Sequence, residues 1–259
     1  KMVEEARSLI RQGDMFQCVL SQRFSAEYSG RPLDYYRNLR VTNPSNYLYF
    51  YDFGDYQIIG ASPESLVSVK KGQVTTNPIA GTRPRGKDER EDKALAEELL
   101  ADEKEVAEHR MLVDLGRNDI GKIAQNKSVE ITKYMEVEYF RYVMHLTSVV
   151  RGQLLPQLTA MDALKSTLPA GTVSGAPKIR AMKRIYELEQ EKRGVYAGAI
   201  GYLSATGDMD FAIAIRTMIL KNGRAYVQAG AGIVYDSIPA NEYQETINKA
   251  KSMTKIGEM

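Results

Sequence analysis

The sequence predicts an α+β protein whose strands pair mainly in antiparallel fashion. Short β-rich runs alternate with long amphipathic segments, a pattern that predicts both strands and helices. Turn dipeptides such as Gly207-Asp208 and Asn222-Gly223 join neighbouring strand candidates, which favours hairpins over parallel βαβ units. The chain has no tandem repeat at a fixed period and no low-complexity tract, so a repeat array is excluded.

The individual elements follow from hydrophobic periodicity. We expect strands over Phe16–Phe24, Tyr47–Phe53, Tyr56–Ser62, Leu66–Lys70, Gln73–Pro78, Ser128–Tyr134, Val137–Tyr142, Leu146–Gln153, Tyr196–Ser204, Met209–Leu220 and Arg224–Ala229. We expect helices over Met2–Gln12, Asp92–Leu115, Met161–Leu168, Pro177–Leu188 and Asn241–Ile256. Local patterning gives the class α+β but no order of layers.

The composition indicates one globular domain over residues 1–259. The chain is 43% hydrophobic and 26% charged, an ordinary mix for a protein with a large core. No stretch rich in Pro, Gly and Ser interrupts it as a linker would. Because Lys1 stands at the start of a helical pattern, we expect this domain to be the carboxy-terminal part of a longer protein.

Charge and cysteine content exclude several classes of function. The formal net charge of +2 gives no indication of a nucleic-acid or membrane partner. No apolar run in this sequence reaches transmembrane length, and we expect no signal peptide. A single cysteine, Cys18, rules out an internal disulfide framework and fits a reducing compartment, so we expect a cytoplasmic protein.

Two pairs of glutamates are candidates for a metal site. Glu105 and Glu108 are three residues apart in one helical segment, as are Glu242 and Glu245 in another, so each pair shares a helix face. Four carboxylates would suit Mg²⁺ with retained waters. Taken alone, a pair of this kind in a charged helix is more often part of a solvated surface than a metal site.

Two histidines and two charged residues are further candidates for functional roles. His145 lies in a strand pattern and His109 in a helix, where we expect a surface residue or one next to the metal ligands. Glu64 follows an apolar strand and by itself reads as a turn residue. Arg216 interrupts an apolar strand pattern, so it needs a carboxylate partner, either internal or from a ligand.

The run from Pro169 to Arg180 carries the most information. Its sequence, PAGTVSGAPKIR, describes a turn of small residues that opens a helix, where backbone N–H groups favour anions. It lacks the Gly-Lys-Ser/Thr ending of a Walker A loop. It resembles the signature of the chorismate-utilising enzymes, and the segments around Gln17, Glu64, His145, Arg216 and both glutamate pairs are similar to that family as well.

The resemblance implies a layered α/β/β/α fold with two packed antiparallel sheets, and it assigns roles to residues. Mg²⁺ would be held by Glu105, Glu108, Glu242 and Glu245, Glu64 would be the general acid, and His145 would assist loss of pyruvate. Thr172 and Thr82 would shape the ring pocket. The enolpyruvyl carboxylate would be held by Arg216, Tyr196, Lys249 and the glycine loop that contains Gly230 and Gly232.

Two positions indicate the branch of the family. Relatives that add water carry a lysine where this chain has Gln17, and glutamine cannot be that base, which favours ammonia as the nucleophile. Aminodeoxychorismate synthases typically carry a nucleophilic lysine where this chain has Ala80. The sequence therefore resembles anthranilate synthase component I most, with aminodeoxychorismate synthase and aminodeoxyisochorismate synthase as alternatives. A chorismate-binding regulatory domain is the alternative that is not an enzyme.

The chain does not supply its own ammonia. A glutaminase needs an activated cysteine with a histidine partner, whereas Cys18 lies in an apolar strand and is expected to be buried. The resemblance therefore implies a separate glutamine amidotransferase subunit. It also implies that the segment Asn43–Tyr47 forms half of a tryptophan feedback pocket.

Overall fold

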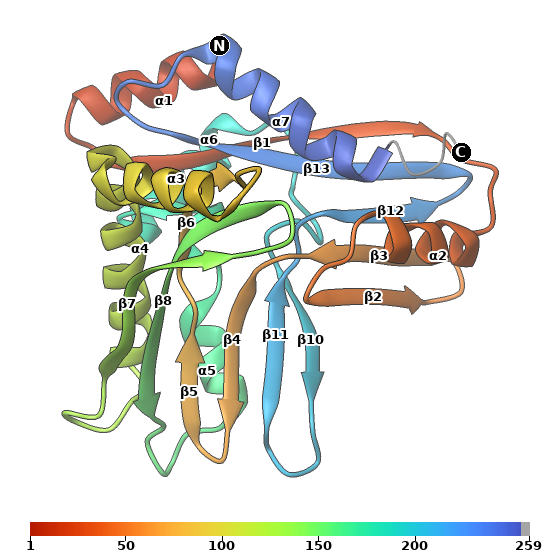
Figure 1. The fold of residues 1–259 in the computed structure, drawn as a ribbon. Helices are drawn as coiled ribbons and strands as arrows, with labels where there is room; N and C mark the ends of the chain where they lie inside the picture. Colours follow the sequence, from red (N-terminus) through yellow and green to blue (C-terminus); the bar gives the residue numbers. More distant parts are fainter. Residues whose placement is uncertain (255–259) are drawn as a thin grey trace. The chain divides into compact units, whose positions relative to one another are not determined.

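The computed structural model describes residues 1–254, which form two compact units. The first unit contains Lys1–Glu64, Pro169–Ile200 and the described residues from Ala212 onward, and the second contains Ser65–Leu168 and Gly201–Phe211. The α+β class with antiparallel sheets is confirmed (Figure 1). The description of residues 1–259 as one catalytic domain stays a prediction.

Helices and strands follow one another along the chain in a mixed order. They are α1 (Met2–Arg11), β1 (Gln17–Glu27), α2 (Pro32–Thr42), β2 (Tyr47–Asp52), β3 (Tyr56–Ser62), β4 (Ser65–Lys70), β5 (Gln73–Thr76), β6 (Ile79–Pro84), α3 (Glu89–Ala101), α4 (Glu103–Gly121), β7 (Glu130–Tyr139), β8 (Val143–Gln153), α5 (Ala160–Thr167), the 3-10 turn η1 (Gly171–Val173), β9 (Gly175–Ala176), α6 (Lys178–Leu188), β10 (Ala199–Leu203), β11 (Met209–Ile213), β12 (Thr217–Lys221), β13 (Arg224–Ile233) and α7 (Pro239–Thr254).

The first unit is built on a sheet with the strand order β2-β3-β12-β13-β1-β9. Its longest pairing joins β1 to β13, from Cys18 opposite Ile233 to Glu27 opposite Arg224. Side chains alternate between the faces of a strand, and the odd-numbered residues 225–233 of β13 face the apolar core. The core beneath them is completed by residues of α1, α2, α6 and α7. The other face, which carries Gln17 and the even-numbered positions of β13, is therefore left for polar groups.

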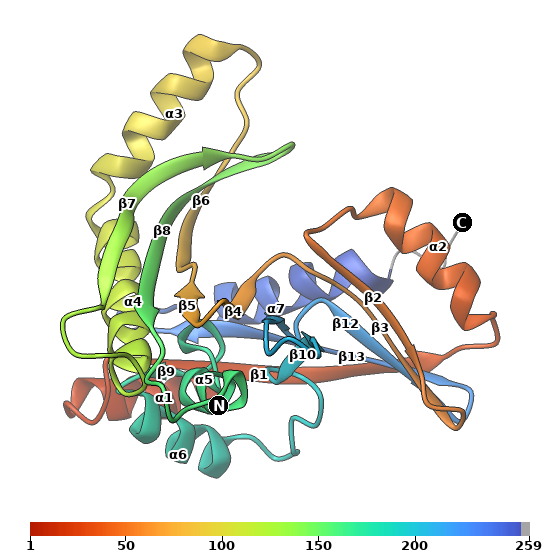
Figure 2. The same cartoon turned by 90° about the horizontal axis from the view of Figure 1, so that it is seen from below.

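The second sheet has the order β10-β11-β4-β5-β8-β6, and β7 also pairs with β8. Leu99 of α3 packs with Met144 and Leu146 of β8 in a buried cluster. Helices α3 and α4 lie along strands β6, β7 and β8 (Figure 2). Strand β6, which carries Gly81 and Thr82, is thus held between β8 and these helices.

Several expected elements differ in the structure, each for a local reason. The helix expected over Asp92–Leu115 is two helices, because Asp102 is extended and caps the start of α4 by accepting from the amides of Lys104 and Glu105. The strand expected over Met209–Leu220 is two strands, because Arg216 between them adopts a positive φ of 48°. The two strands expected over 128–142 form one strand, β7, with irregular pairing.

Other elements were not expected or end differently. Helix α2 and strand β6 had no counterpart among the predicted elements. The residues expected as a glycine loop, Ala229–Ile233, continue strand β13 opposite β1, so the prediction of a loop was wrong. The end of the expected helix Asn241–Ile256 lies outside the described residues.

Candidate active site

Glu64 and Thr172 form a direct side-chain hydrogen bond in the first unit. Glu64 follows β3, and its backbone accepts a hydrogen bond from the amide of Ile213. The hydroxyl of Thr172 in η1 donates to Oε1 of Glu64 at 2.8 Å. Removal from water raises the pKa of Glu64 to about 7, although the Thr172 hydrogen bond and the charge of Lys249 both act to lower it. A carboxyl with this pKa can hold and release a proton at neutral pH.

The segment that contains Thr172 was expected to be a turn that leads directly into a helix, but in the structure it forms two short elements before the helix begins. The 3-10 turn is followed by the two-residue strand β9, and α6 begins only at Lys178. The amide of Val19 in β1 donates to the carbonyl of Ser174 at 2.9 Å, and the Ser174 hydroxyl donates to the carbonyl of Ala170. The small residues thus allow the loop to lie against β1, which presents Thr172 to Glu64.

The edge of β13 offers two backbone amides, those of Gly230 and Gly232. In an antiparallel ladder, residues directly opposite each other either both point toward the partner strand or both point away. Ser21 lies opposite Gly230, and its amide donates away from β13, to Glu189. Val19 lies opposite Gly232, and its amide also points away. Both glycine amides therefore face the β13 edge that β12 leaves uncovered, since β12 pairs only with Arg224–Val227.

The same edge is bordered by Tyr196 and Lys249. A Cβ built on Gly230 would lie 2.5 Å from the hydroxyl of Tyr196, so this tyrosine approaches the strand only because the residue is glycine. The ammonium group of Lys249 donates to the carbonyl of Gly230 at 3.0 Å and pairs with Glu245 at 2.6 Å. Two amides, a phenol and an ammonium group together favour an anionic ligand.

Arg216 has no carboxylate partner among residues 1–254. Its guanidinium donates to the hydroxyl of Ser252 at 3.3 Å, and burial alone lowers its pKa. Of the two partners expected for Arg216, a carboxylate of the chain itself is therefore not found among the described residues. Because a buried guanidinium without an anion is costly, a ligand carboxylate is the natural partner.

Gln17 is a buried amide with an unused acceptor. Its side chain is 5% exposed, and Oε1 has no hydrogen-bond partner among residues 1–254. A Cβ on Gly232 would lie 2.7 Å from the Gln17 amide nitrogen, so this glycine provides the space that the side chain fills. The neighbouring Cys18 is buried, as expected, and burial raises the pKa of its thiol to about 12. Such a thiol is not a thiolate at neutral pH.

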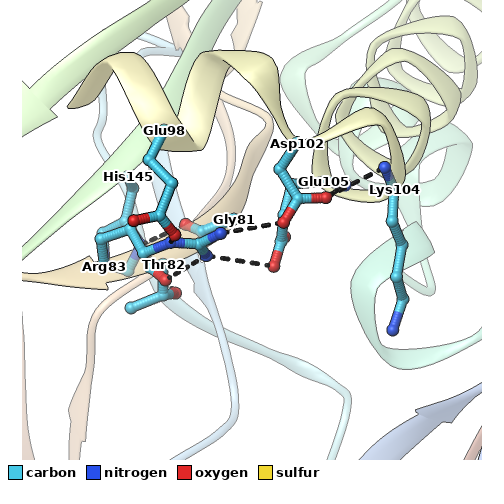
Figure 3. Close-up of polar contacts among 8 residues, drawn as sticks. All are labelled: Gly81, Thr82, Arg83, Glu98, Asp102, Lys104, Glu105 and His145. Atoms are coloured by element: carbon cyan, nitrogen blue, oxygen red, sulfur yellow. Dashed lines mark hydrogen bonds and ion pairs between the residues drawn. The ribbon is translucent and has the colours of Figure 1, made fainter. Parts of the chain in front are cut away.

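In the second unit His145 is held by strand β6 (Figure 3). Its Nδ1 lies 2.8 Å from the carbonyl of Gly81 and 3.1 Å from the hydroxyl of Thr82. A carbonyl can only accept, so Nδ1 carries the proton and, in the neutral ring, Nε2 is the acceptor. Ala80, also in β6, offers no nucleophile and lies opposite Leu146 of β8. His145 is thus oriented to receive a proton at Nε2.

Arg83 connects the surroundings of His145 to helix α4, which carries Glu105. It pairs with Glu98 at 2.9 Å, Asp102 at 2.8 Å and Glu105 at 3.6 Å, and it donates to the carbonyl of Thr82 (Figure 3). Its pKa is raised by these hydrogen bonds, first by that to Asp102. Motif reading did not single out Arg83, although an arginine directly after Gly81-Thr82 could have signalled it.

The two glutamate pairs lie on the helices expected for them, but on different units. Glu105 and Glu108 are one turn apart on α4, and Glu242 and Glu245 are one turn apart on α7. Within residues 1–254 no group of three or more potential ligands is gathered closely enough to hold a metal ion. Each pair does fit a hard cation by its chemistry, because two carboxylates share one helix face.

His109 differs from its expectation as a surface residue. It is 0% exposed, and its Nε2 lies 2.6 Å from the hydroxyl of Ser148 in β8. Burial lowers its pKa to about 4, so the ring is neutral. The Ser148 hydroxyl also accepts from the amide of Met135 in β7. His109 therefore joins α4 to the pairing of β7 and β8. A helix pattern alone did not reveal this contact.

Comparison with known proteins shows the family to which this chain belongs. The model of the family described as chorismate binding enzyme matches residues 1–255. Anthranilate synthase component 1 of Lactococcus lactis is 63% identical over 256 residues, which is 99% of this chain and 56% of that protein. The protein of the same name from Aquifex aeolicus is 54% identical over all of this chain and 52% of its own length. The chain thus spans about half the length of the curated relatives it matches.

Solved structures agree with the sequence comparison. Anthranilate synthase component I from Streptococcus pneumoniae TIGR4 is 83% identical, with a TM-score of 0.92 over 98% of this chain and 56% of that one. The menaquinone-specific isochorismate synthase MenF from Escherichia coli is 26% identical, with a TM-score of 0.89 over 98% of this chain and 59% of that one. The same fold therefore occurs in relatives whose names give different reactions.

Proposed function

Since this chain belongs to the chorismate binding enzyme family, we propose that it aminates chorismate with ammonia and eliminates pyruvate to form anthranilate, for tryptophan biosynthesis. The observation that carries this proposal is Glu64, a carboxyl whose pKa of about 7 lets it act as a general acid at neutral pH. A location in the cytoplasm is part of the proposal. No helix within residues 1–254 has both the length and the apolar character to cross a membrane.

The first step replaces a ring hydroxyl by an amino group. Ammonia adds to the ring carbon next to the one that bears the carboxylate, the ring double bonds shift, and the hydroxyl leaves as water after taking the proton of Glu64. Gln17 supports ammonia as the nucleophile, because its unpaired Oε1 can accept an N–H but cannot deprotonate water. The product of this step is aminodeoxyisochorismate.

The second step forms the aromatic ring. Nε2 of His145 takes a proton from the substrate ring, and the electrons of that C–H bond expel the side chain as enolpyruvate, which takes up a proton from solvent to become pyruvate. The bond from His145 Nδ1 to the carbonyl of Gly81 supports this role by fixing the tautomer. The role of His145 in elimination rests on family resemblance together with this geometry.

Binding of the substrate is assigned to groups of the first unit. The amides of Gly230 and Gly232, the hydroxyl of Tyr196 and the guanidinium of Arg216 would hold the enolpyruvyl carboxylate, with Lys249 beside them. Thr172 and Thr82 would border the ring. Each of these groups is an N–H or O–H donor or a cation, which suits a dicarboxylate.

Magnesium is proposed as the cofactor, with Glu105, Glu108, Glu242 and Glu245 as the residues that would hold it. When bound, Mg²⁺ screens the ring carboxylate and fixes its position. The ion pairs of Glu105 with Arg83 and of Glu245 with Lys249 offset part of the negative charge of these helices. Chorismate and ammonia are the proposed small-molecule partners, and a glutamine amidotransferase subunit is proposed to supply the ammonia.

The test is incubation of the purified chain with chorismate, Mg²⁺ and excess ammonium salt at about pH 8, where some free ammonia is present and part of Glu64 still carries its proton. We expect a fluorescent product with the mass of anthranilate, and none when glutamine replaces ammonium, because the Cys18 thiol stays protonated. The variant Glu64→Gln is the matched control and should be inactive. Formation of aminodeoxychorismate or isochorismate, or turnover with glutamine alone, would contradict the proposal.

A further inference from the structure

An ion pair between Arg193 and Glu189 contacts the loop that carries Thr172. The guanidinium of Arg193 donates to both carboxylate oxygens of Glu189, from Nη2 at 2.7 Å and from Nε at 2.8 Å. The Glu189 side chain is only 6% exposed, and the Arg193 side chain 17%. A bidentate pair with this burial has one well-defined geometry.

Arg193 joins two backbone segments in addition to Glu189. Its Nη1 donates to the carbonyl of Val173 in η1 at 2.6 Å, and its Nη2 donates to the carbonyl of Val19 in β1 at 2.7 Å. Val173 directly follows Thr172, and Val19 lies opposite Gly232. One planar group thus sets the distance between the Thr172 loop and strand β1, which pairs with β13 opposite Gly230 and Gly232.

Glu189 joins the ion pair to Ser21 of strand β1. Its Oε1 accepts from both the amide and the hydroxyl of Ser21, each at 2.8 Å. The Arg193 guanidinium also lies over the ring of Tyr196, with Cζ 5.4 Å from the ring centroid. The pair therefore contacts the Thr172 loop, strand β1, which pairs with β13 opposite Gly230 and Gly232, and the tyrosine that approaches Gly230.

We propose that the Arg193–Glu189 ion pair is a positioning device that holds Thr172 on Glu64 and Tyr196 against Gly230. The inference rests on the proposed function, in which Glu64 is the acid and Tyr196 binds the carboxylate. Neither Arg193 nor Glu189 contacts Glu64, so both act through the groups they hold. A lysine at position 193 has no planar fork and cannot bridge two carbonyls and a carboxylate in the same way.

The position of Thr172 has a measurable effect on Glu64. The groups that act on this carboxyl are Thr172 from η1 and Lys249 from α7, and the charge of Glu64 in turn acts on the phenol of Tyr196. Burial raises the pKa of Glu64, and the Thr172 hydrogen bond is the larger of the two effects that lower it. If the loop loses its anchor and this hydrogen bond is lost, the pKa of Glu64 must rise further.

The first experiment measures this titration without any substrate. Protein labelled with ¹³Cδ-glutamate is titrated by NMR, and the Glu64 signal is assigned by its absence from Glu64→Gln. We expect Arg193→Lys and Arg193→Met to raise the pKa of Glu64 by the same amount as Thr172→Val. Arg184→Met is the matched control, because Arg184 pairs with Asp14 and Glu187 and should leave Glu64 unchanged.

A folded Arg193→Lys variant with the wild-type titration of Glu64 would overturn the inference, provided that Thr172→Val shifts it. Arg193→Lys keeps the charge, so it serves as the test if Arg193→Met fails to fold. The titration needs no turnover, so it decides the positioning role even if the protein forms no anthranilate.

A double-mutant cycle on kcat gives a second test. Displacing a catalytic contact lowers rates by up to about 100-fold. If Arg193 acts through Thr172, then Thr172→Val combined with Arg193→Lys should lower kcat no further than the more damaging single variant. If the fold-losses in kcat of the two single variants multiply in the double variant, Arg193 and Thr172 act independently, which would contradict the proposal.

Discussion

The hydroxyl of Thr172 donates a 2.8 Å hydrogen bond to Oε1 of Glu64, and it is a principal influence opposing the burial that raises the pKa of this carboxyl. Burial is the larger effect, and the pKa is about 7 instead of the usual 4.5. A carboxyl buried without such a donor would stay protonated to higher pH, and an exposed one would be ionised. The pair therefore keeps Glu64 close to the pH at which an acid both gives and regains a proton.

Replacing Thr172 by Val should move the alkaline limb of activity upward. Glu64 acts in its protonated form, so activity is lost as pH rises through its pKa. Without the hydrogen bond the pKa rises, and we expect the limb of kcat/KM to shift by about 0.5 to 1 pH unit. The profile is measured at constant free ammonia, so that the titration of ammonium does not enter. A limb that stays in place would mean that Glu64 is not the group observed.

The proposed magnesium site should depend on both glutamate pairs. Glu108→Gln and Glu245→Gln each remove one anionic oxygen ligand and keep the side-chain shape, so we expect activity to fall by about 100-fold or more. Folding, followed by thermal unfolding, should be nearly unchanged. Glu103→Gln is the matched control, because Glu103 is exposed on the first turn of the same helix, α4.

Calorimetric titration with Mg²⁺ separates the metal site from other causes of inactivity. We expect weaker Mg²⁺ binding in Glu108→Gln and Glu245→Gln and normal binding in Glu103→Gln. A variant that binds Mg²⁺ and depends on it as the unsubstituted protein does would show that its glutamate is not a ligand.

Replacing His145 by Met should slow the second step more than the first. Amination needs Glu64, which the substitution leaves in place, whereas elimination loses the base at Nε2. A general base contributes roughly 10²–10⁴-fold, so aminodeoxyisochorismate should accumulate while anthranilate formation falls. Chromatography of reactions quenched at intervals follows both compounds. If His145 only orients the ring, chorismate consumption and anthranilate formation should slow in proportion, with no intermediate.

Gly230→Ala should weaken binding of chorismate. The new Cβ would lie 2.5 Å from the Tyr196 hydroxyl and 3.0 Å from the carbonyl of Leu20, so the tyrosine must move away from the β13 edge. We expect KM for chorismate to rise about tenfold or more, with a smaller change in kcat. Gly121→Ala is the control, because a Cβ there meets no atom within 4 Å. An unchanged KM in Gly230→Ala would remove this edge from the carboxylate site.

Elements with a local signal could be predicted before the structure was known. A short apolar run predicted β3 with its observed bounds, and the three-residue spacing placed Glu105 with Glu108 on one helix face. Motif resemblance pointed to Glu64 and Thr172 although they lie 108 positions apart, and the structure joins them by a hydrogen bond. These inferences needed only periodicity, residue chemistry and motif resemblance.

The groups that these residues contact became apparent only in the folded chain. Gly230 and Gly232 read as a loop, because glycine is rare in strands, yet pairing with β1 makes them a strand with two outward amides. His109 read as a surface residue, because its partner Ser148 lies 39 positions away on another element. Arg193 carried no motif, and its contacts reach back as far as Val19 in β1. Burial and hydrogen bonding depend on segments that are distant in the chain, and neither is encoded in a local pattern.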